Sequence, residues 1–382
     1  MSIDSLFSEE HRLLRRTVRR FVAEELDPYV DEWEAEGIVP REIYRKMGEL
    51  GFLGIRYPEA YGGLDADLVM SVAFAEELAR CRSRGLTMGV LVHTDMASPY
   101  LVRYGTDAQM NRYLPGIISG EQICAVAITE PNAGSDVAGL ETKAERDGDV
   151  YVLNGSKTFI TNALIADLFF VAARTRPKGD HDGLSLFLVE KGTPGFQVEK
   201  KLEKLGMWAS DTGELAFTDC RVPADNLIGE ENCGFYQLME GFQNERLMAS
   251  VAMVSSAQQA IEDAIGYAQE RELFGRKLST YQATQHKLAR METELEAARQ
   301  LIYHVVRRHE AGKPIVKQVT MAKALTAEVT CRVADECLQI HGGYGYIREY
   351  DIERFYRDIR LWKIGGGATE VMWEIIAKEM EI

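Results

Sequence analysis

The sequence lacks the cysteine pattern of a disulfide-rich or zinc-binding protein. Its six cysteines are scattered over 382 residues, with no CxxC pair and no companion cluster of histidines. A disulfide framework or a zinc site is recognised by cysteines at short, characteristic spacings. We therefore predict reduced thiols and no bound metal. The cysteines are Cys81, Cys124, Cys220, Cys233, Cys331 and Cys337.

Long apolar runs and an excess of positive charge are also missing. No stretch approaches the length of a membrane span, and the first residues contain no apolar core of a secretory signal. Glu9 and Glu10 argue against a transit peptide at the Arg-rich start. The formal net charge of -15 disfavours binding to nucleic acid or anionic lipid through the overall field. We predict a soluble, cytoplasmic protein with no nucleic-acid or membrane partner.

Three segments of different periodicity follow one another along the chain. Residues 1–120 carry apolar residues at helical spacing. Residues 121–233 hold short runs rich in β-branched and aromatic residues, separated by Gly, Asn, Asp or Pro, as in a β-barrel or sandwich. Residues 234–382 return to long amphipathic helices. The predicted fold is α+β and multidomain: an N-terminal α-helical domain, a middle β domain, and a C-terminal domain like a four-helix bundle.

Two polar loops adjoin predicted strands of the middle segment. "AITEPNAGSDVAGLETKA" is dense in hydroxyl and small residues, so its backbone N–H groups and hydroxyls can approach a phosphate or cofactor. A decorated turn has the same composition. In "NGSKTFITNA", Phe159 and Thr161 alternate by two, which places them on one face of a strand. They form either a cross-strand packing pair or a wall and a hydrogen bond for a flat ring.

Two further motifs lie in the last segment. "RELFGRKLSTYQATQHKLA" interrupts a long helix at Gly275, and its Arg271, Arg276 and Lys277 suit either a pyrophosphate or a solvated basic turn. "QIHGGYGY" follows a helix with a glycine pair. Such a pair is a normal helix end, and it also lets backbone approach a ligand closely.

Together, "TEPNAGSD", "QIHGGYGY" and the other two motifs resemble the acyl-CoA dehydrogenase family of flavoproteins over essentially the whole chain. The resemblance implies FAD between the β domain and the C-terminal helices, with a neighbouring subunit of a homotetramer contributing. Phe159 stands where many relatives have tryptophan. The implied FAD contacts are Thr129, Phe159 and Thr161 at the flavin, Arg271, Phe274, Gln282, Gln339, Gly342 and Gly343 at the pyrophosphate and adenine, and Thr369 and Glu370 near the adenosine.

The family reaction needs a carboxylate that removes the α-proton of an acyl-CoA thioester. Many relatives carry that glutamate at the position of Gly366, which has no side chain. A subgroup that includes isovaleryl-CoA and long-chain acyl-CoA dehydrogenases carries it on a helix, where this chain has Glu245. The residue lies on an otherwise apolar helical stripe. We predict Glu245 as the base, with a pKa raised by burial; an edge glutamate paired with Arg246 is the alternative.

The same comparison assigns roles around the substrate. Ser135, Arg246 and Gly365 are implied in binding the CoA thioester, and Ser135 is also placed near the cofactor. The backbone N–H of Gly366 would polarise the thioester oxygen. Space at this glycine turn favours a branched, cyclic, or medium- or long-chain acyl group.

Asp95 is a rival carboxylate in the N-terminal segment. Its plain structural role is a helix cap or a hydrogen bond to the nearby Ser98 and His93. In the family this region borders the acyl pocket. Asp95 could therefore act as a base on a cyclic acyl-CoA.

The main functional prediction is an FAD-dependent acyl-CoA dehydrogenase that passes electrons to an electron-transfer flavoprotein. An acyl-CoA oxidase of the same fold is the first alternative. A DNA-associated flavoprotein would need a strongly basic face, which a charge of -15 opposes. A scaffold that binds FAD without catalysis is the last alternative.

Overall fold

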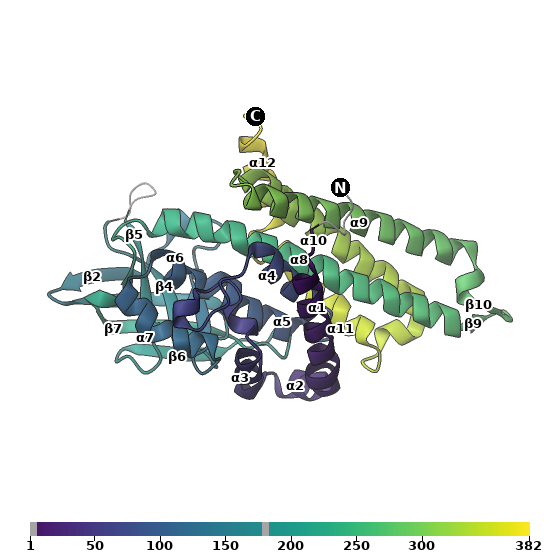
Figure 1. Cartoon of the computed structure of the whole chain (residues 1–382), viewed down its shortest axis with the longest axis horizontal. Coiled ribbons are helices and arrows are strands. Elements are labelled where there is room, and N and C mark those ends of the chain that lie inside the picture. Colours follow the sequence, from purple (N-terminus) through teal and green to yellow (C-terminus); the bar gives the residue numbers. More distant parts are fainter. Residues whose placement is uncertain (1–5, 178–182) are drawn as a thin grey trace.

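The computed structural model describes residues 6–177 and 183–382, and the N-terminal part of it is helical (Figure 1). Helix α1 begins where the Ser8 hydroxyl accepts a hydrogen bond from the backbone N–H of His11, which satisfies a free donor at the helix start. A π-helical turn, Val92–Ala97, carries Asp95. The helices are α1 Glu9–Phe21, α2 Val30–Glu36, α3 Arg41–Glu49, α4 Leu68–Leu78, α5 Arg84–Leu91, α6 Pro99–Tyr104 and α7 Asp107–Ile118.

The middle of the chain forms an eight-stranded mixed sheet. Its strand order is β6-β7-β3-β2-β4-β5-β8, and β1 pairs with β4 in parallel. Every residue of β4 is buried, which explains its unbroken hydrophobic sequence. The strands are β1 Cys124–Ala127, β2 Lys143–Asp147, β3 Val150–Thr161, β4 Leu168–Arg174, β5 Leu184–Glu190, β6 Phe196–Lys201, β7 Thr212–Pro223 and β8 Leu227–Ile228.

Long helices form the last part of the molecule. Helix α8 has 37 residues, so it is roughly 55 Å long and runs from the sheet to the far end of the helical region (Figure 1). A small hairpin of β9 Glu272–Leu273 and β10 Arg276–Lys277 stands at that far end. The helices are α8 Gly234–Glu270, α9 Gln282–Glu310, α10 Val316–His341, α11 Asp351–Ile359 and α12 Thr369–Lys378. The predicted fold class is confirmed.

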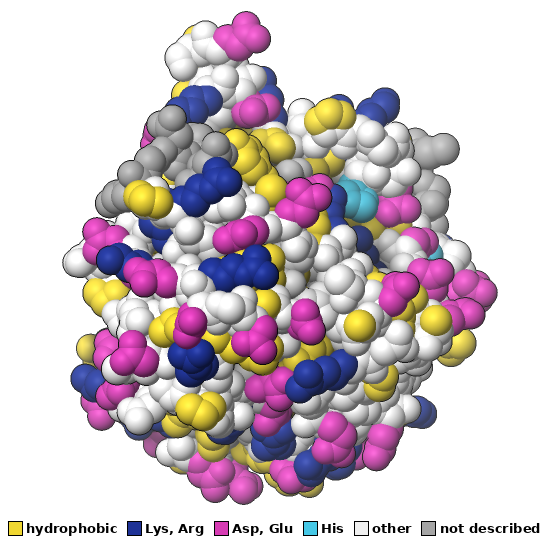
Figure 2. Space-filling view, turned by 90° about the vertical axis from the view of Figure 1, so that its left-hand side faces the viewer, with side chains coloured by type: hydrophobic (Ala, Val, Ile, Leu, Met, Phe, Trp, Pro, Cys, Tyr) yellow, Lys and Arg dark blue, Asp and Glu magenta, His cyan; other side chains and the backbone are white. Residues whose placement is uncertain are grey.

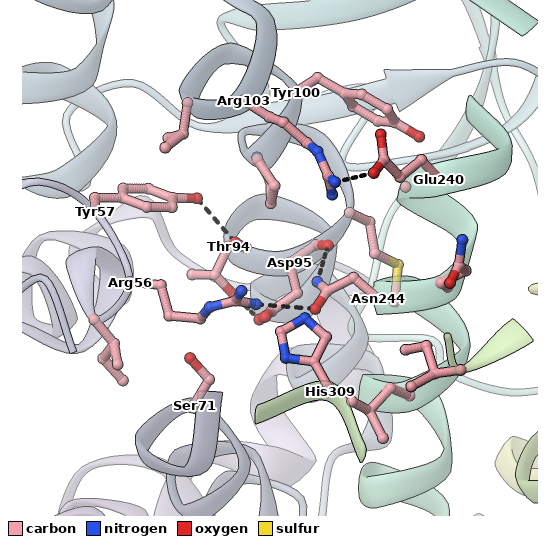
Figure 3. Close-up of a pocket in the computed structure, with 18 of the residues that line it drawn as sticks. Arg56, Tyr57, Ser71, Thr94, Asp95, Tyr100, Arg103, Glu240, Asn244 and His309 are labelled. Carbon is pink, nitrogen blue, oxygen red and sulfur yellow. Dashed lines mark hydrogen bonds and ion pairs between the residues drawn. The ribbon is translucent and has the colours of Figure 1, made fainter. Parts of the chain in front are cut away.

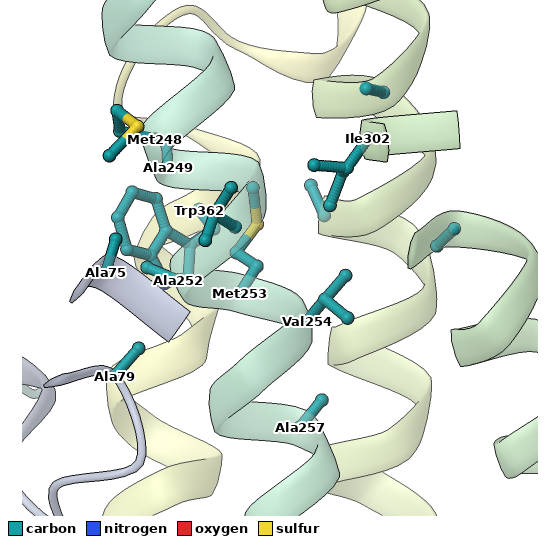
Figure 4. Packing of buried hydrophobic residues seen from close by; sticks show 14 of the residues in the cluster. Ala75, Ala79, Met248, Ala249, Ala252, Met253, Val254, Ala257, Ile302 and Trp362 are labelled. Atoms are coloured by element: carbon teal, nitrogen blue, oxygen red, sulfur yellow. The ribbon is translucent and has the colours of Figure 1, made fainter. Parts of the chain in front are cut away.

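A core of buried side chains joins α4, α8, α9 and α10. Trp362 enters this core and is only 3% exposed. Figure 4 shows its ring beside alanines of α4 and α8, where the small side chains leave room for an indole. The indole fixes the chain just before the glycine turn at residues 365–367, so core packing also sets the position of that turn.

The outer surface carries charges of both signs. On the face shown in Figure 2, basic and acidic side chains are interspersed among the described residues, with no broad basic patch. No helix of residues 6–177 and 183–382 is long and apolar enough to cross a membrane. The same residues contain no group of three or more His, Cys, Asp or Glu side chains arranged to hold a metal ion. The six cysteines all lie in this part of the chain and none is disulfide-bonded.

Candidate active site

The glycine turn and Glu245 lie against each other. A Cβ at position 366 would lie 3.4 Å from Oε1 of Glu245. A side chain at position 366 and the carboxyl of Glu245 would therefore occupy neighbouring space, although the two residues are far apart in the sequence. Gly366 also has a φ of +67°, which strains any residue with a side chain. The turn suits glycine, and the carboxyl group at this point comes from α8.

Glu245 is partly buried, and the protein around its carboxyl raises its pKa. Burial is the main cause, because it disfavours the charged form, while the positive charges of Arg246 and Lys323 act in the opposite direction. The direction agrees with the prediction from sequence. The guanidinium of Arg246 lies over the Phe242 ring at 5.9 Å, and its buried Nε has no hydrogen-bond partner among the described residues. Arg246 is thus available to a ligand.

Lys323 was missed by the sequence analysis. It lies on α10, fully buried, and its Nζ donates hydrogen bonds to the carbonyl oxygens of Trp362, at 2.8 Å, and of Gly367. One ammonium group thus ties both sides of the glycine turn to α10. Burial is the main reason that its pKa is lowered to about 8. The available signal was a lysine between two alanines in "MAKALTA", since small neighbours are typical of a buried helix face.

The loop that contains Thr129 lies beside β3. The backbone N–H of Thr158 donates to the carbonyl oxygen of Thr129 at 2.9 Å. Phe159 is 68% exposed and has a φ of +59°. The β3–β7 register shifts between Lys157 and Ile160, so the simple alternation argument does not hold at Phe159. A bulge directs this ring outward, while Thr161 resumes the regular ladder.

A buried ion pair fixes this loop, and it also escaped the sequence analysis. Nζ of Lys157 lies 2.8 Å from Oε1 of Glu130 and donates to the carbonyl oxygen of Ile128. Glu130 in turn accepts the backbone N–H groups of Glu141 and Thr142. The pair therefore joins both ends of the loop to β3. Ser135, on the outer part of the loop, is exposed.

The other predicted cofactor residues gather at the far end of the helical region. The guanidinium of Arg271 lies 5.5 Å from the Tyr344 ring, which brings the hairpin and the glycine pair together. Phe274 at the hairpin tip is 90% exposed. Gly342 and Gly343 have open space where a Cβ would stand. Gln282 begins α9, and Gln339 lies exposed near the end of α10.

The two sets of predicted cofactor residues stay apart within one chain. The sheet and the hairpin occupy opposite ends of the molecule (Figure 1). Phe159 and Thr161 therefore cannot meet Arg271 and Phe274 of the same chain around one small molecule. Thr369 and Glu370 lie in a third place, beside the glycine turn. The hydroxyl of Thr369 donates to the Lys363 carbonyl, and the negative charge of Glu370 acts to raise the pKa of Lys323.

A cavity of about 760 Å³ opens beside α8, between α4, the π-helical turn and the loop before α10 (Figure 3). Gly241 and Asn244 line it from α8, next to Glu245 in sequence, and Tyr100 lines it from α6. The charge of Glu245 contributes to the raised pKa of Tyr100, after burial. Glu245 itself does not line the cavity, but its neighbour Asn244 and the nearby Tyr100 do. Its volume is within the range of small-molecule sites.

Asp95 is buried in the wall of this cavity. Its Oδ2 accepts a hydrogen bond from the Thr94 hydroxyl at 2.6 Å. The predicted bonds to Ser98 and His93 are wrong, because the Ser98 hydroxyl donates to the His93 carbonyl and contacts Tyr57 instead. Burial raises the pKa of Asp95, and the charge of Arg56 opposes that effect.

Models of one known protein family match nearly all of this chain, including the residues of the site. Residues 8–121, 125–220 and 232–381 match the N-terminal, middle and C-terminal domains of acyl-CoA dehydrogenase. The long-chain specific acyl-CoA dehydrogenase of Rattus norvegicus mitochondria is 41% identical over 100% of this chain and 88% of its own length. Isovaleryl-CoA dehydrogenase of Pongo abelii mitochondria is 41% identical over 97% of this chain and 88% of its own.

A solved structure is similar in the same way. The acyl-CoA dehydrogenase of Geobacillus kaustophilus superposes with a TM-score of 0.96 and 46% identity, covering 98% of this chain and 99% of the other. The resemblance seen in the four sequence motifs is therefore confirmed. This chain belongs to the acyl-CoA dehydrogenase family of FAD-dependent oxidoreductases.

Proposed function

We propose that the protein dehydrogenates an acyl-CoA between C2 and C3, with Glu245 as the base, and passes the electrons to an electron-transfer flavoprotein. The observation that carries this proposal is the 3.4 Å between Oε1 of Glu245 and the Cβ position of residue 366. A carboxyl group from α8 thus reaches the point to which a side chain on the glycine turn would lead. Glu245 takes the place that family resemblance assigns to a loop glutamate.

The proton chemistry follows from the surroundings of Glu245. Its ionised carboxylate accepts the C2 proton, and a pKa raised by burial makes it a stronger base than an exposed glutamate. Bound FAD supplies the acceptor for the hydride that leaves C3 as the C2–C3 double bond forms. The positive charges of Arg246 and Lys323 favour the ionised carboxylate and oppose the effect of burial.

The glycine turn holds the other end of the reacting group. We assign the backbone N–H of Gly366 to the thioester oxygen, where a donor stabilises the negative charge that develops as the C2 proton leaves. Lys323 supports this role because it bonds the carbonyls of Trp362 and Gly367 on either side. Ser135 and Arg246, with its unpaired Nε, are the proposed CoA contacts.

The cofactor requires a second subunit in this proposal. Thr129, Phe159 and Thr161 would hold the flavin, with Thr369 and Glu370 towards the adenosine part. The adenine and pyrophosphate would lie on a partner's hairpin, at Arg271, Phe274 and Gln282, and on its glycine pair beside Gln339. The open space at Gly342 and Gly343 and the exposed Phe274 fit such a ligand. We propose a homotetramer, testable by light scattering of the flavin-loaded enzyme.

No observation favours the oxidase alternative, and the cytoplasmic location and the electron-transfer flavoprotein remain predictions. A branched, cyclic, or medium- or long-chain acyl group remains the proposed substrate. Asp95 as a second base on a cyclic acyl-CoA has one point in its favour, a buried carboxyl in the cavity wall. An acyl-CoA panel that includes a cyclic member, repeated with Asp95→Asn, tests that role.

The test of the main proposal is anaerobic mixing of the flavin-loaded enzyme with acyl-CoAs while the flavin absorbance is followed. We expect bleaching by saturated acyl-CoAs, and a rate lower by about 10²–10⁴-fold in Glu245→Gln. The exposed Glu32→Gln of α2 is the matched control and should bleach at the wild-type rate. Full-rate bleaching by Glu245→Gln would exclude Glu245 as the base. Rapid reoxidation by oxygen, in place of an electron-transfer flavoprotein, would identify an oxidase.

A further inference from the structure

The cavity beside α8 has a polar wall at one part of its surface. Ser71 of α4, Arg56 and Asp95 all line it, and all three are wholly or partly buried (Figure 3). An ordinary saturated acyl chain has no group that could bond to any of them. We propose that this wall recognises a neutral hydroxyl group on the acyl chain, so that the preferred substrates are hydroxylated acyl-CoAs. This inference rests on the proposed dehydrogenase function.

The hydrogen-bonding capacity of the wall is largely unused within the chain. Arg56 donates one bond from Nη1, to Oδ1 of Asn244 at 3.0 Å, and Asn244 is itself held by the Asp95 carbonyl at 2.8 Å. The remaining guanidinium donors form no hydrogen bond or ion pair within the described residues. The Ser71 hydroxyl is likewise without a partner in residues 6–177 and 183–382. Asp95 has Oδ1 left as an acceptor after Thr94 takes Oδ2.

An alkyl chain in this place would be unfavourable. It would displace water from Ser71, Arg56 and Asp95 and return no hydrogen bond to any of them. A hydroxyl group both donates and accepts, so one group can bond to the Asp95 carboxylate and receive a bond from Arg56 or Ser71. The donors and the acceptor stand in one wall, which is what a hydroxyl requires.

The charges of the wall argue for a neutral group. Arg56 is cationic and close enough to Asp95 to oppose the rise in that carboxyl's pKa. A carboxylate on the acyl chain would be attracted by Arg56 and repelled by Asp95, and an ammonium group would meet the reverse. Elsewhere in the lining, Arg103 and Tyr104 both bond to Glu240, and Lys313 and His309 also line the cavity. Neutral hydrogen-bonding groups avoid both repulsions.

The polar wall is separate from the reacting carbons. Glu245 owes its raised pKa to burial, against Arg246 and Lys323, while Asp95 owes its own to burial, against Thr94, Arg56 and Asn244. Asp95 lines the cavity and Glu245 does not, so the two carboxyls stand in different surroundings. Tyr100 and Gly241 connect them along the cavity. The recognised hydroxyl therefore lies further along the chain than C2 and C3.

The experiment compares acyl-CoAs of equal length with and without a terminal hydroxyl. Straight chains of six, eight and ten carbons are tested as alkyl, terminal-hydroxyl and terminal-carboxyl forms, by anaerobic flavin bleaching. We expect the hydroxyl form of at least one length to exceed its alkyl partner about ten-fold in kcat/KM, with the carboxyl form below both. Binding of the matching alkyl-CoA thioethers, which have no carbonyl and cannot react, is measured by calorimetry and should show the same preference.

Variants locate the effect. Ser71→Ala and Arg56→Met should each reduce the hydroxyl preference, and Arg56→Met combined with Asp95→Leu should abolish it in both measurements. Arg20→Met, at an exposed arginine of α1, is the matched control and should keep the preference. The inference fails if alkyl chains bleach the flavin and no hydroxyl form is preferred, or if the carboxyl form is preferred. If no acyl-CoA bleaches the flavin, the proposed function fails together with it.

Discussion

Two fully buried lysines, one in each half of the molecule, have their charges stabilised by different partners. Lys157 in the sheet lies 2.8 Å from the Glu130 carboxylate, so its charge is neutralised where it stands. Lys323 in the helices bonds only carbonyl oxygens, those of Trp362 and Gly367, among the described residues. Burial lowers the pKa of both to about 8. The comparison shows that a buried lysine can be neutralised by a direct ion pair, as Lys157 is by Glu130, or be held by carbonyl oxygens alone, as Lys323 is.

The difference matters for the site. The pair of Lys157 and Glu130 holds the loop that leads to Phe159, and its charges cancel locally. The charge of Lys323 remains available to Glu245, where it opposes the rise in pKa caused by burial. Lys157 therefore holds a loop, whereas Lys323 holds the glycine turn and also lowers the pKa of the nearby Glu245 carboxyl.

The largest expected effect comes from breaking the pair in the sheet. Lys157→Met leaves Glu130 buried without its cation, and we expect a loss of about 3–5 kcal/mol in the free energy of unfolding. Chemical denaturation measures it, and flavin content should fall because the loop loses its anchor. Lys157→Met with Glu130→Gln removes both charges and should lose clearly less. Equal losses in the single and double variants would contradict the neutralised pair.

Lys323→Met should cost less stability and more activity. It leaves two carbonyl oxygens without a donor, and we expect a loss of about 1–3 kcal/mol in the free energy of unfolding. Removing the cation also raises the pKa of Glu245 further, so the acidic limb of the bleaching rate should move to higher pH. A pH profile of anaerobic flavin bleaching tests this. Lys200→Met, at an exposed lysine of β6, is the comparison variant, because its acidic limb should stay in place.

Gly366→Ala tests whether the turn itself is specific for glycine. A residue with a side chain is strained at a φ of +67°, and we expect a loss of about 1 kcal/mol in the free energy of unfolding. The added Cβ also stands 3.4 Å from Oε1 of Glu245, so the bleaching rate should fall. Gly148→Ala, at a φ of +64° with open space around it, is the matched control. It should lose similar stability and keep the rate.

The last prediction is a pH dependence of stability. Between about pH 8, the lowered pKa of Lys323, and its ordinary value of 10.5, the unfolded chain binds the proton more than the folded chain does. The free energy of unfolding contributed by this lysine therefore rises with pH across that window and is constant below it. Denaturation of the wild type and Lys323→Met at several pH values measures the difference. The free energy of unfolding of the wild type relative to Lys323→Met should therefore rise with pH. A fall with rising pH would contradict a lowered pKa of Lys323 in the folded chain.

Periodicity and turn residues were sufficient to predict the order of the three parts, while the resemblance to the family came from four sequence motifs. Glu245 could be proposed because the family resemblance implies a glutamate on this helix when Gly366 lacks a side chain, and because a lone glutamate at 245 interrupts an apolar helical stripe. Phe159 was proposed from alternation along a strand, whereas a bulge exposes its ring, and its contact with the flavin stays a prediction. Lys157, Lys323 and Arg56 were not proposed, because the burial of a single charged residue depends on partners distant in sequence.

The sequence by itself determined which segments are helix and which are strand, since the spacing of apolar residues and glycines is a local property. It also determined that position 366 provides no carboxylate. Only the tertiary structure decided that the carboxyl of α8 reaches that turn, that Lys323 stands behind it, and that polar side chains from three elements face one cavity. These are contacts between distant residues, and they exist only when the core packing of α4, α8 and α10 brings those residues together.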